Sequence, residues 1–340
     1  MSSSITLPPP YPVKVHSYLP LSSSTSSPAH PLQAYEHLPD YDAQASPPST
    51  QPPPNVLVFI GGLGDGPHTI PYVRHLATYL SSSSNNNNNT PATASGSPAP
   101  RYRVFEARLT SAFSAFGYGS LAQDARELAA LVRHLRGPLV GARRVVLMGH
   151  STGCQDCLEY VGREGWAEEG EGLKVDGLVL QGPVSDREAI GMTEDKREVE
   201  AALRVAERMV REGRGGEVMA TGEMPSGWRG SPVTAYRWAS LAGVGGDDDY
   251  FSSDLPDEKL ESVWGRLEQP VLILPSEKDE WVPADTDVMG LVNRWKSFCK
   301  PGIASDLSGL IPGANHRVDN PAGQEWLADR VARFLAELEK

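Results

Sequence analysis

A nucleophilic serine is indicated by the pentapeptide GHSTG, residues 149–153, which has the G-x-S-x-G spacing. It follows the apolar run Val145 to Met148 and precedes a segment with helical character, so Ser151 is predicted to lie in a sharp turn between a buried strand and a helix. Such a turn needs glycine on both sides, because a neighbouring side chain would clash where the backbone reverses. The alternative interpretation is a plain structural turn without chemistry.

A serine hydroxyl is a weak nucleophile at neutral pH and needs a base within hydrogen-bonding reach. His316, in PGANH, follows the last predicted strand, and it is the only histidine after the serine motif. A histidine alone is more often a surface or packing residue. Its position in the chain nevertheless fits the order nucleophile, acid, histidine, and we therefore expect His316 to be the general base.

The third member of such a triad is an acid that accepts a hydrogen bond from the far nitrogen of the imidazole. Asp279 comes just after the apolar run VLILP, in SEKDEWVP, where the loop is expected to turn toward the serine. Glu277 and Glu280 are close rivals, and Asp186 after the preceding strand is a second placement. We expect Asp279 to be the acid.

Acyl transfer also needs two backbone N–H groups that stabilise the developing oxyanion. Thr152, directly after the serine, is expected to supply one. The glycine-rich run GGLGDG, residues 61–66, is expected to supply the other from Leu63, or in second place from Gly62. A flexible glycine turn is the plain alternative. Nucleotide phosphate binding is rejected, because the run lacks the Lys-Ser/Thr of a P-loop and the spacing of a full G-x-G-x-x-G unit.

The segments around these residues alternate between apolar strands and amphipathic helices, as in a parallel sheet with helices on both faces. The predicted fold is α/β, an α/β-hydrolase fold with a mostly parallel, doubly wound sheet and an inserted cap. The predicted parts are a partly ordered Pro/Ser-rich segment with an edge strand at LQAYEHL (1–54), the first part of the core (55–185), the cap (186–266) and the second part of the core (267–340). The Ser/Asn-rich stretch before Tyr102 is expected to be a mobile loop.

Several features have two interpretations. The pair Cys154 and Cys157 has redox or zinc spacing, but no second pair completes a site, which favours packing cysteines. The run Asp247 to Asp249 is interpreted as a solvated acidic turn rather than a cation site. A group of aromatic residues in or near the predicted cap either lines a substrate pocket or holds the cap to the core: Trp228, Tyr236, Trp238, Tyr250 and Phe251.

Composition limits the classes of partner and compartment. A formal net charge of −12 without a Lys/Arg cluster argues against nucleic acid. The sequence shows no membrane span and no secretory leader, and its three cysteines are too few for a disulfide framework, so a cytoplasmic protein is expected. No metal and no organic cofactor is expected.

The segments GHSTGCQDCLEY, IGGLGDG and DDDYFSSDL resemble a fungal α/β-hydrolase family long labelled only as a domain of unknown function, which includes intracellular siderophore esterases. The resemblance covers about residues 30 to 338. It implies hydrolysis of the ester bonds of fusarinine-type siderophores, with release of iron, and by motif position it places the triad on Ser151, Asp279 and His316.

The expected function is therefore that of a serine esterase that forms an acyl-enzyme on a small-molecule ester, with a ferric siderophore as the implied substrate. Within enzymes, the alternatives are a general short-acyl esterase, a thioesterase or a lactonase. The alternative of another class is a non-catalytic siderophore-binding protein. An intact set of triad candidates favours the enzyme, because a decayed member of the fold would be expected to lack one of the three residues.

Overall fold

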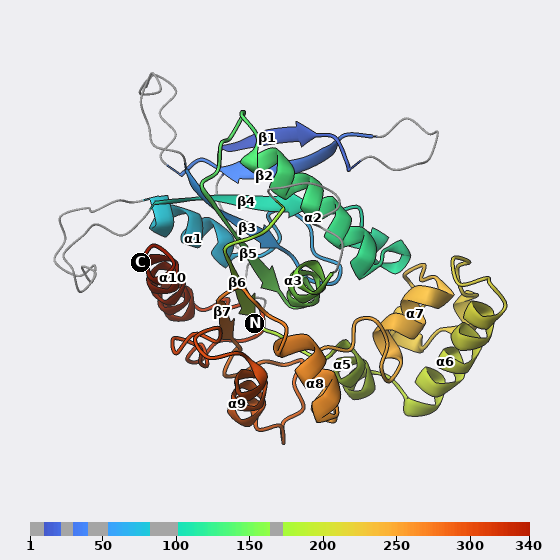
Figure 1. Ribbon diagram of the computed structural model, residues 1–340. Coiled ribbons are helices and arrows are strands. Elements are labelled where there is room, and N and C mark those ends of the chain that lie inside the picture. Colours follow the sequence, from blue (N-terminus) through green and yellow to red (C-terminus); the bar gives the residue numbers. More distant parts are fainter. Residues whose placement is uncertain (1–9, 22–29, 40–53, 82–100, 164–172) are drawn as a thin grey trace, which may run out of the picture.

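The structure is a computed structural model that describes residues 10–21, 30–39, 54–81, 101–163 and 173–340. Its centre is a seven-stranded sheet in the order β1-β2-β4-β3-β5-β6-β7 (Figure 1). The strands are β1 (Val13–Tyr18), β2 (Leu32–His37), β3 (Asn55–Ile60), β4 (Tyr102–Arg108), β5 (Arg144–His150), β6 (Gly177–Gln181) and β7 (Val271–Leu274). The predicted mostly parallel sheet is confirmed, because β4, β3, β5, β6 and β7 run parallel.

Each central strand is a continuous apolar run because both of its faces are covered. All six residues of β3 are buried, as are all four residues of β7. Parallel strands with helices on both faces need apolar side chains at every position, not at alternate ones. The carboxyl ends of these strands meet at one edge of the sheet, which is where ligands bind in open α/β folds.

The described helices of eight or more residues are α1 (Tyr72–Ser81), α2 (Leu121–Arg136), α3 (Gly153–Gly162), α5 (Asp186–Thr193), α6 (Lys196–Arg211), α7 (Ala235–Ala242), α8 (Asp257–Trp264), α9 (Val288–Phe298) and α10 (Pro321–Glu337). Short 3-10 helices are η1 (Phe113–Tyr118), η2 (Thr221–Glu223) and η3 (Ser226–Trp228). Figure 1 shows α1 and α10 on one side of the sheet, with α2 and α3 on the other. No helix in the described ranges combines the length and the apolar character needed to cross a membrane.

The helices close two apolar cores on the faces of the sheet. Leu57 and Phe59 of β3 face α1 and α10, whereas Val56 and Val58 of the same strand face α2 and α3. Helix α2 begins where the Ser120 hydroxyl accepts a hydrogen bond from the Gln123 N–H, and Gly137 follows its end. Such caps satisfy backbone groups that would otherwise lack partners at the helix ends.

The N-terminal strands extend the sheet by antiparallel pairing. Strand β2 is the segment LQAYEHL expected at the edge, but it pairs with both β1 and β4, and β1 forms the edge. The expected strand is thus confirmed, and only its place at the edge was wrong, because VKVHSY mixes exposed and buried positions and gives no clear strand signal. The Ser/Asn-rich stretch that was expected to be mobile comprises residues 82–100, which lie outside the described residues.

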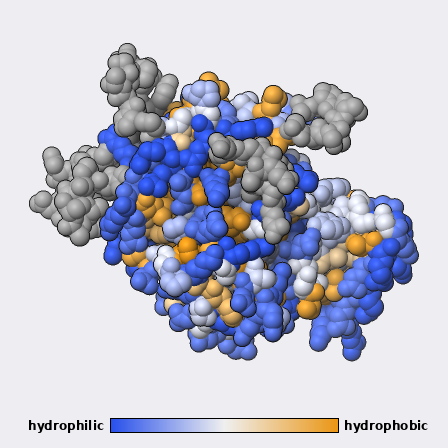
Figure 2. All heavy atoms as spheres, in the orientation of Figure 1, coloured by the Kyte–Doolittle hydropathy of each residue, from blue (hydrophilic) through white to orange (hydrophobic). Residues whose placement is uncertain are grey.

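The helices between β6 and β7 form a further layer beside the sheet. Helices α5, α6 and α7 share a separate apolar cluster centred on Trp238, which is fully buried. Figure 2 shows a hydrophilic outer surface over α6, with hydrophobic residues toward α7. Leu63 and Phe116 pack against the same cluster, so this layer lies next to the glycine-rich run. The division into a cap at 186–266 and two core parts stays a prediction.

The aromatic residues of this region pack in cores. Trp228 and Trp238 contact each other with ring centroids 5.0 Å apart inside the α5–α7 cluster. Tyr250 and Phe251 belong instead to the core shared with α2 and α3. Of the two interpretations of this group, the structure favours a packing role for these four residues.

Candidate active site

Ser151 lies in the strained turn that its motif predicts, between β5 and α3. Its φ is 55°, a left-handed conformation that is uncommon for a residue with a side chain. The turn requires both flanking glycines: a Cβ on Gly149 would lie 2.2 Å from Gly153 O, and a Cβ on Gly153 would lie 2.4 Å from Ile60 O. The Ser151 N–H donates to Gln181 O at 3.0 Å, which ties the turn to β6.

His316 and Asp279 form a buried pair. The Nδ1 of His316 lies 2.8 Å from Asp279 Oδ2, and the two side chains are 5% and 2% exposed. The other carboxylate oxygen of Asp279 accepts the Trp281 N–H at 3.1 Å, which fixes the carboxylate. An imidazole that donates from Nδ1 presents the lone pair of Nε2, the state required of a general base.

The rival acids have other partners. Glu280 accepts the backbone N–H of His316 at 2.8 Å, and Glu277 accepts that of Gly313 at 2.6 Å. Asp186 accepts the Gln155 amide at 2.8 Å. Of the four candidates, Asp279 is therefore the one that contacts the imidazole, while Glu277 and Glu280 hold the loop that carries it.

The sheet brings this pair to the same edge as Ser151. The rings of His150 and His316 have centroids 4.8 Å apart, so His316 lies against the residue before the serine. A Cβ on Gly182, at the end of β6, would lie 3.2 Å from the imidazole of His316 and 3.7 Å from Asp279 Oδ2. Within the described residues, no hydrogen bond joins the Ser151 hydroxyl to His316; such bonds often tighten only when substrate binds.

Gln181 connects the imidazole loop to the core of the sheet. Its Oε1 lies 2.5 Å from His150 Nδ1 and accepts the Tyr72 hydroxyl at 2.9 Å, while its Nε2 donates to His316 O at 3.2 Å. Burial, together with the nearby His316, holds the pKa of His150 well below its usual value. His150 is therefore a neutral packing partner and not a competing base.

The two expected oxyanion donors line one small cavity. Leu63 and Thr152 both contribute to its wall, and the cavity has a volume of about 30 Å³. Gly62 also lines it and lies against the serine, because a Cβ on Gly62 would be 2.6 Å from Ser151 Cβ and 3.2 Å from Ser151 Oγ. The Gly62 N–H already donates to Asp65 Oδ2 at 3.2 Å, which favours Leu63 over Gly62 as the second donor.

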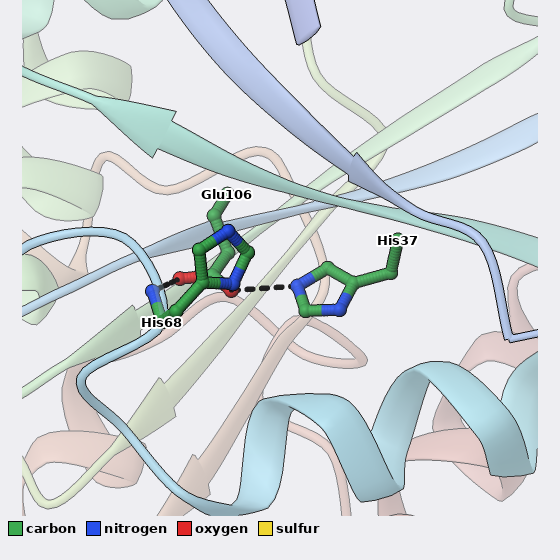
Figure 3. Close-up of side chains that lie close together, drawn as sticks. All are labelled: His37, His68 and Glu106. Carbon is green, nitrogen blue, oxygen red and sulfur yellow. Dashed lines mark hydrogen bonds and ion pairs between the residues drawn. The ribbon is translucent and has the colours of Figure 1, made fainter. Parts of the chain in front are cut away.

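A histidine and carboxylate cluster holds the loop that carries Leu63 (Figure 3). Glu106 of β4 accepts the backbone N–H of His68 at 2.7 Å through one oxygen. Its other oxygen lies 3.0 Å from His68 Nδ1 and 2.6 Å from His37 Nε2. Burial alone would raise the pKa of Glu106, but the hydrogen bonds from both histidines outweigh it and lower the pKa to about 2.

These three residues are also the one group in the described part of the chain whose ligand atoms are close enough to hold a metal ion. Two imidazoles and a carboxylate are a ligand set that zinc or iron accepts. Both histidines, however, lie within hydrogen-bond distance of the same Glu106 oxygen, so hydrogen bonding alone accounts for the close approach of the three side chains. Sequence reasoning missed the cluster, because its members come from β2, β4 and a loop without a shared motif.

The remaining expectations near the site have mixed outcomes. Cys154 and Cys157 are fully buried in the core, which confirms the packing interpretation.

The acidic turn at 247–249 is solvated only at Asp247. Asp248 is 1% exposed and forms an ion pair with Arg237 at 2.7 Å, so the expectation was wrong there. The partner lies eleven residues earlier, on α7, and no local pattern in the acidic run indicates it.

Curated relatives match most of the chain. The UPF0613 protein PB24D3.06c of Schizosaccharomyces pombe is 31% identical over 297 residues, which cover 83% of this chain and 87% of that protein. The fusarinine C esterase sidJ of Aspergillus fumigatus is 30% identical over 336 residues, which cover 84% of this chain and 90% of that protein.

Solved structures agree with the fold. The siderophore hydrolase EstB from Aspergillus fumigatus superposes with a TM-score of 0.70 at 27% identity and covers 97% of this chain and 98% of its own. An α/β-hydrolase fold protein of unknown function superposes with a TM-score of 0.62 at 17% identity, over 98% of both chains, and supports the fold alone. The family described as "Protein of unknown function (DUF1749)" matches residues 22–336, and the chain belongs to this family of α/β-hydrolase fold.

Proposed function

We propose that the chain is a serine-dependent carboxylic ester hydrolase. The observation that carries the proposal is the buried pair of His316 and Asp279, 2.8 Å apart, at the sheet edge where Ser151 has a φ of 55°. A strained serine beside an oriented imidazole is the arrangement that acyl transfer requires. The esterase and hydrolase names of the relatives support the same class of reaction.

In the proposed reaction, Ser151 Oγ attacks the ester carbonyl carbon while its proton passes to His316 Nε2. Asp279 stabilises the imidazolium, and the N–H groups of Thr152 and Leu63 stabilise the oxyanion. The alcohol leaves with the proton from His316, and an acyl-enzyme remains on the serine. Water that has lost its proton to His316 then attacks the acyl carbonyl, and the serine leaves as the proton returns to it.

We propose a siderophore ester of the fusarinine type as the substrate. Two relatives that match most of the chain, a fusarinine C esterase and a siderophore hydrolase, support this choice over other esters. The proposed partner is thus a small molecule that presents an ester carbonyl to the serine, and no cofactor takes part in the steps above.

The test is hydrolysis of fusarinine C by the wild type beside Ser151→Ala, followed by chromatography. We expect monomers to be released by the wild type and the rate to fall at least about a thousandfold in the variant, since subtilisin loses more than this when its serine is removed. Ser297→Ala is the matched control, because Ser297 is an exposed residue of α9 whose hydroxyl donates to Arg294 O. Activity of Ser151→Ala near that of Ser297→Ala would refute the mechanism. Cleavage of 4-nitrophenyl acetate without cleavage of fusarinine C would refute the substrate alone.

A further inference from the structure

The proposed oxyanion donor Leu63 lies in a tight turn that Asp65 closes. The Asp65 N–H donates to Gly62 O at 3.0 Å, and the Gly62 N–H donates to Asp65 Oδ2 at 3.2 Å, so Leu63 and Gly64 are the central residues of the turn. Gly64 has a φ of 78°, the conformation that a type II turn requires at its third residue. The side chain of Asp65 therefore holds the turn that presents the Leu63 N–H.

The proposed base His316 lies in a second tight turn. The Val318 N–H donates to Asn315 O at 3.0 Å, so His316 and Arg317 are the central residues of this turn. Val318 is fully buried and has a φ of 52°, which is rare for a β-branched residue. Such a conformation persists only where the surrounding structure imposes it. Neighbouring residues of a turn constrained in this way cannot move independently, so the position of Arg317 is tied to that of His316.

The side chain of Arg317 joins these two turns. Its Nη1 lies 3.2 Å from Asp65 Oδ1, and its Nη2 donates to Thr69 O. The Thr69 hydroxyl donates to the same oxygen of Asp65 at 2.9 Å. Asp65 and Arg317 are 252 residues apart in the sequence, so it is the fold that brings them together. The guanidinium group thus bridges the loop of the oxyanion donor and the loop of the base.

The exposure of this ion pair argues against a mainly stabilising role. The side chain of Arg317 is 40% exposed and that of Asp65 is 12% exposed. Ion pairs at exposed positions contribute little to the free energy of unfolding, because solvent screens their charges. Catalysis is more sensitive to such a link, since a displacement of about 1 Å in the reacting geometry can lower a rate about a hundredfold.

We propose that Asp65 and Arg317 are a pair of positioning residues that hold Leu63 and His316 at a fixed separation on either side of Ser151. Neither side chain transfers a proton or contacts the oxyanion. The attack of the serine needs both linked groups at once, because His316 accepts the proton in the same step in which the Leu63 N–H stabilises the oxyanion. The pair therefore acts on the transition state more than on the binding of substrate. The inference deepens the proposed function and rests on it.

The test measures hydrolysis of 4-nitrophenyl acetate and inhibition by phenylboronic acid, which forms a tetrahedral adduct on an activated serine. In Arg317→Met we expect kcat/KM to fall about tenfold to a hundredfold, which is less than the loss when an oxyanion donor itself is removed. The inhibition constant of phenylboronic acid should rise by a similar factor, because its adduct resembles the transition state. Arg317→Lys should lie between the two proteins, since its ammonium group can pair with Asp65 but lacks the planar fork that also reaches Thr69 O.

A double-mutant cycle tests whether the two residues act as a pair. Asp65→Asn removes the charge but keeps an oxygen that can accept the Gly62 N–H. We expect it to lower kcat/KM in the same direction as Arg317→Met. The double variant should lose little more than the more impaired single variant, because the second change removes a partner that is already lost.

The matched control is Arg136→Met, which removes an arginine with the same kinds of contact at the other end of the sheet. Arg136 pairs with Asp176 at 2.6 Å and donates to Ala142 O at 3.2 Å, and these partners precede β6 and β5. Both paired side chains are less exposed than that of Arg317. The control should therefore lower the temperature of thermal unfolding at least as much as Arg317→Met, while kcat/KM and the inhibition constant stay unchanged at a temperature at which all variants are folded.

A kcat/KM of Arg317→Met within about twofold of the wild type would overturn the positioning role and leave the serine mechanism intact. An equal loss in Arg136→Met would also overturn it, because a general loss of stability would then explain the effect. So would effects of Asp65→Asn and Arg317→Met that multiply in the double variant, since independent residues behave in this way. A wild type that hydrolyses neither 4-nitrophenyl acetate nor fusarinine C and does not react with a fluorophosphonate would overturn the proposed function and this inference with it.

Discussion

Two sets of buried carboxyl groups lie near the same edge of the sheet and differ in their partners. Asp279 is 2% exposed, and its carboxylate contacts the imidazole of His316 at 2.8 Å. Asp124 and Asp156 are buried to a similar degree, and the charge of Arg237, which is itself paired with Asp248, only partly offsets their burial. A buried carboxylate is stable only when another group compensates its charge. The chain supplies that group at Asp279, whereas at the other two positions burial raises the pKa and favours the protonated carboxyl.

The largest effect is expected from Asp279→Asn, which removes the charge from the paired carboxyl. The amide no longer stabilises the imidazolium and favours the wrong tautomer of His316, and the same change in a serine protease lowers kcat about 10⁴-fold. We expect a loss of similar size in kcat for any ester the protein hydrolyses. The matched control is Glu277→Gln, because Glu277 accepts the Gly313 N–H and does not contact the imidazole. If Asp279→Asn kept more than a tenth of the activity, Asp279 would not be the acid.

The next effect concerns Arg237, a buried cation whose charge interacts with Asp248, Asp186 and Asp124. Arg237 is 4% exposed and pairs with Asp248, which also accepts the Ser240 hydroxyl at 2.7 Å. In Arg237→Met the carboxylate of Asp248 stays buried without its cation, and breaking a buried pair in this way costs about 3–5 kcal/mol of unfolding free energy. Urea unfolding measures the loss. Arg214→Met is the control, since Arg214 pairs with Glu217 at an exposed position and should change stability little.

A smaller, pH-dependent effect is expected from Asp124→Asn. The pKa of Asp124 is raised to about 7. Burial is the largest cause and is opposed by the Ser111 hydrogen bond, while Glu127 and Asp248 add to the increase and Arg237 reduces it. The folded protein therefore binds a proton that the unfolded chain releases near pH 4, and the wild type loses stability as pH rises from about 4 to about 7.

Asparagine does not ionise, so the unfolding free energy of Asp124→Asn should not show this decrease with rising pH. We expect the variant to gain unfolding free energy relative to the wild type between pH 5 and pH 8, by about 1–4 kcal/mol on a scale of about 1.4 kcal/mol per pKa unit. Thermal unfolding of both proteins at the two pH values measures the difference. An equal difference at pH 5 and pH 8 would show that Asp124 is ionised throughout this range.

The paired site could be predicted from the sequence because its residues follow strands. Parallel strands place their carboxyl ends at one edge, so Ser151 after β5 and Asp279 after β7 had to lie near each other. The chain order of nucleophile, acid and histidine then identified His316, which follows Asp279, as the predicted base. The close approach of Gly62 to Ser151 follows from the same rule, since β3 ends just before it.

The unpaired carboxyl groups could not be predicted in this way. Asp124 and Asp156 lie on α2 and α3, where a polar residue in a helical pattern is usually solvated, but both are buried, and Asp124 accepts a hydrogen bond from Ser111 in a preceding loop. Asp248 was misjudged for the same reason, because its partner Arg237 belongs to α7, a helix that was not separately predicted. Periodicity predicts which face of a helix is apolar but not which polar groups a distant segment covers.

The serine mechanism is tested most directly by covalent labelling with a fluorophosphonate, which reacts with an activated serine, followed by intact mass and peptide mapping. We expect one equivalent to bind to the wild type at Ser151, none to bind to Ser151→Ala, and the labelling rate to fall sharply in His316→Ala. Labelling at another residue, or equal labelling of the wild type and Ser151→Ala, would contradict the assignment of Ser151 as the nucleophile.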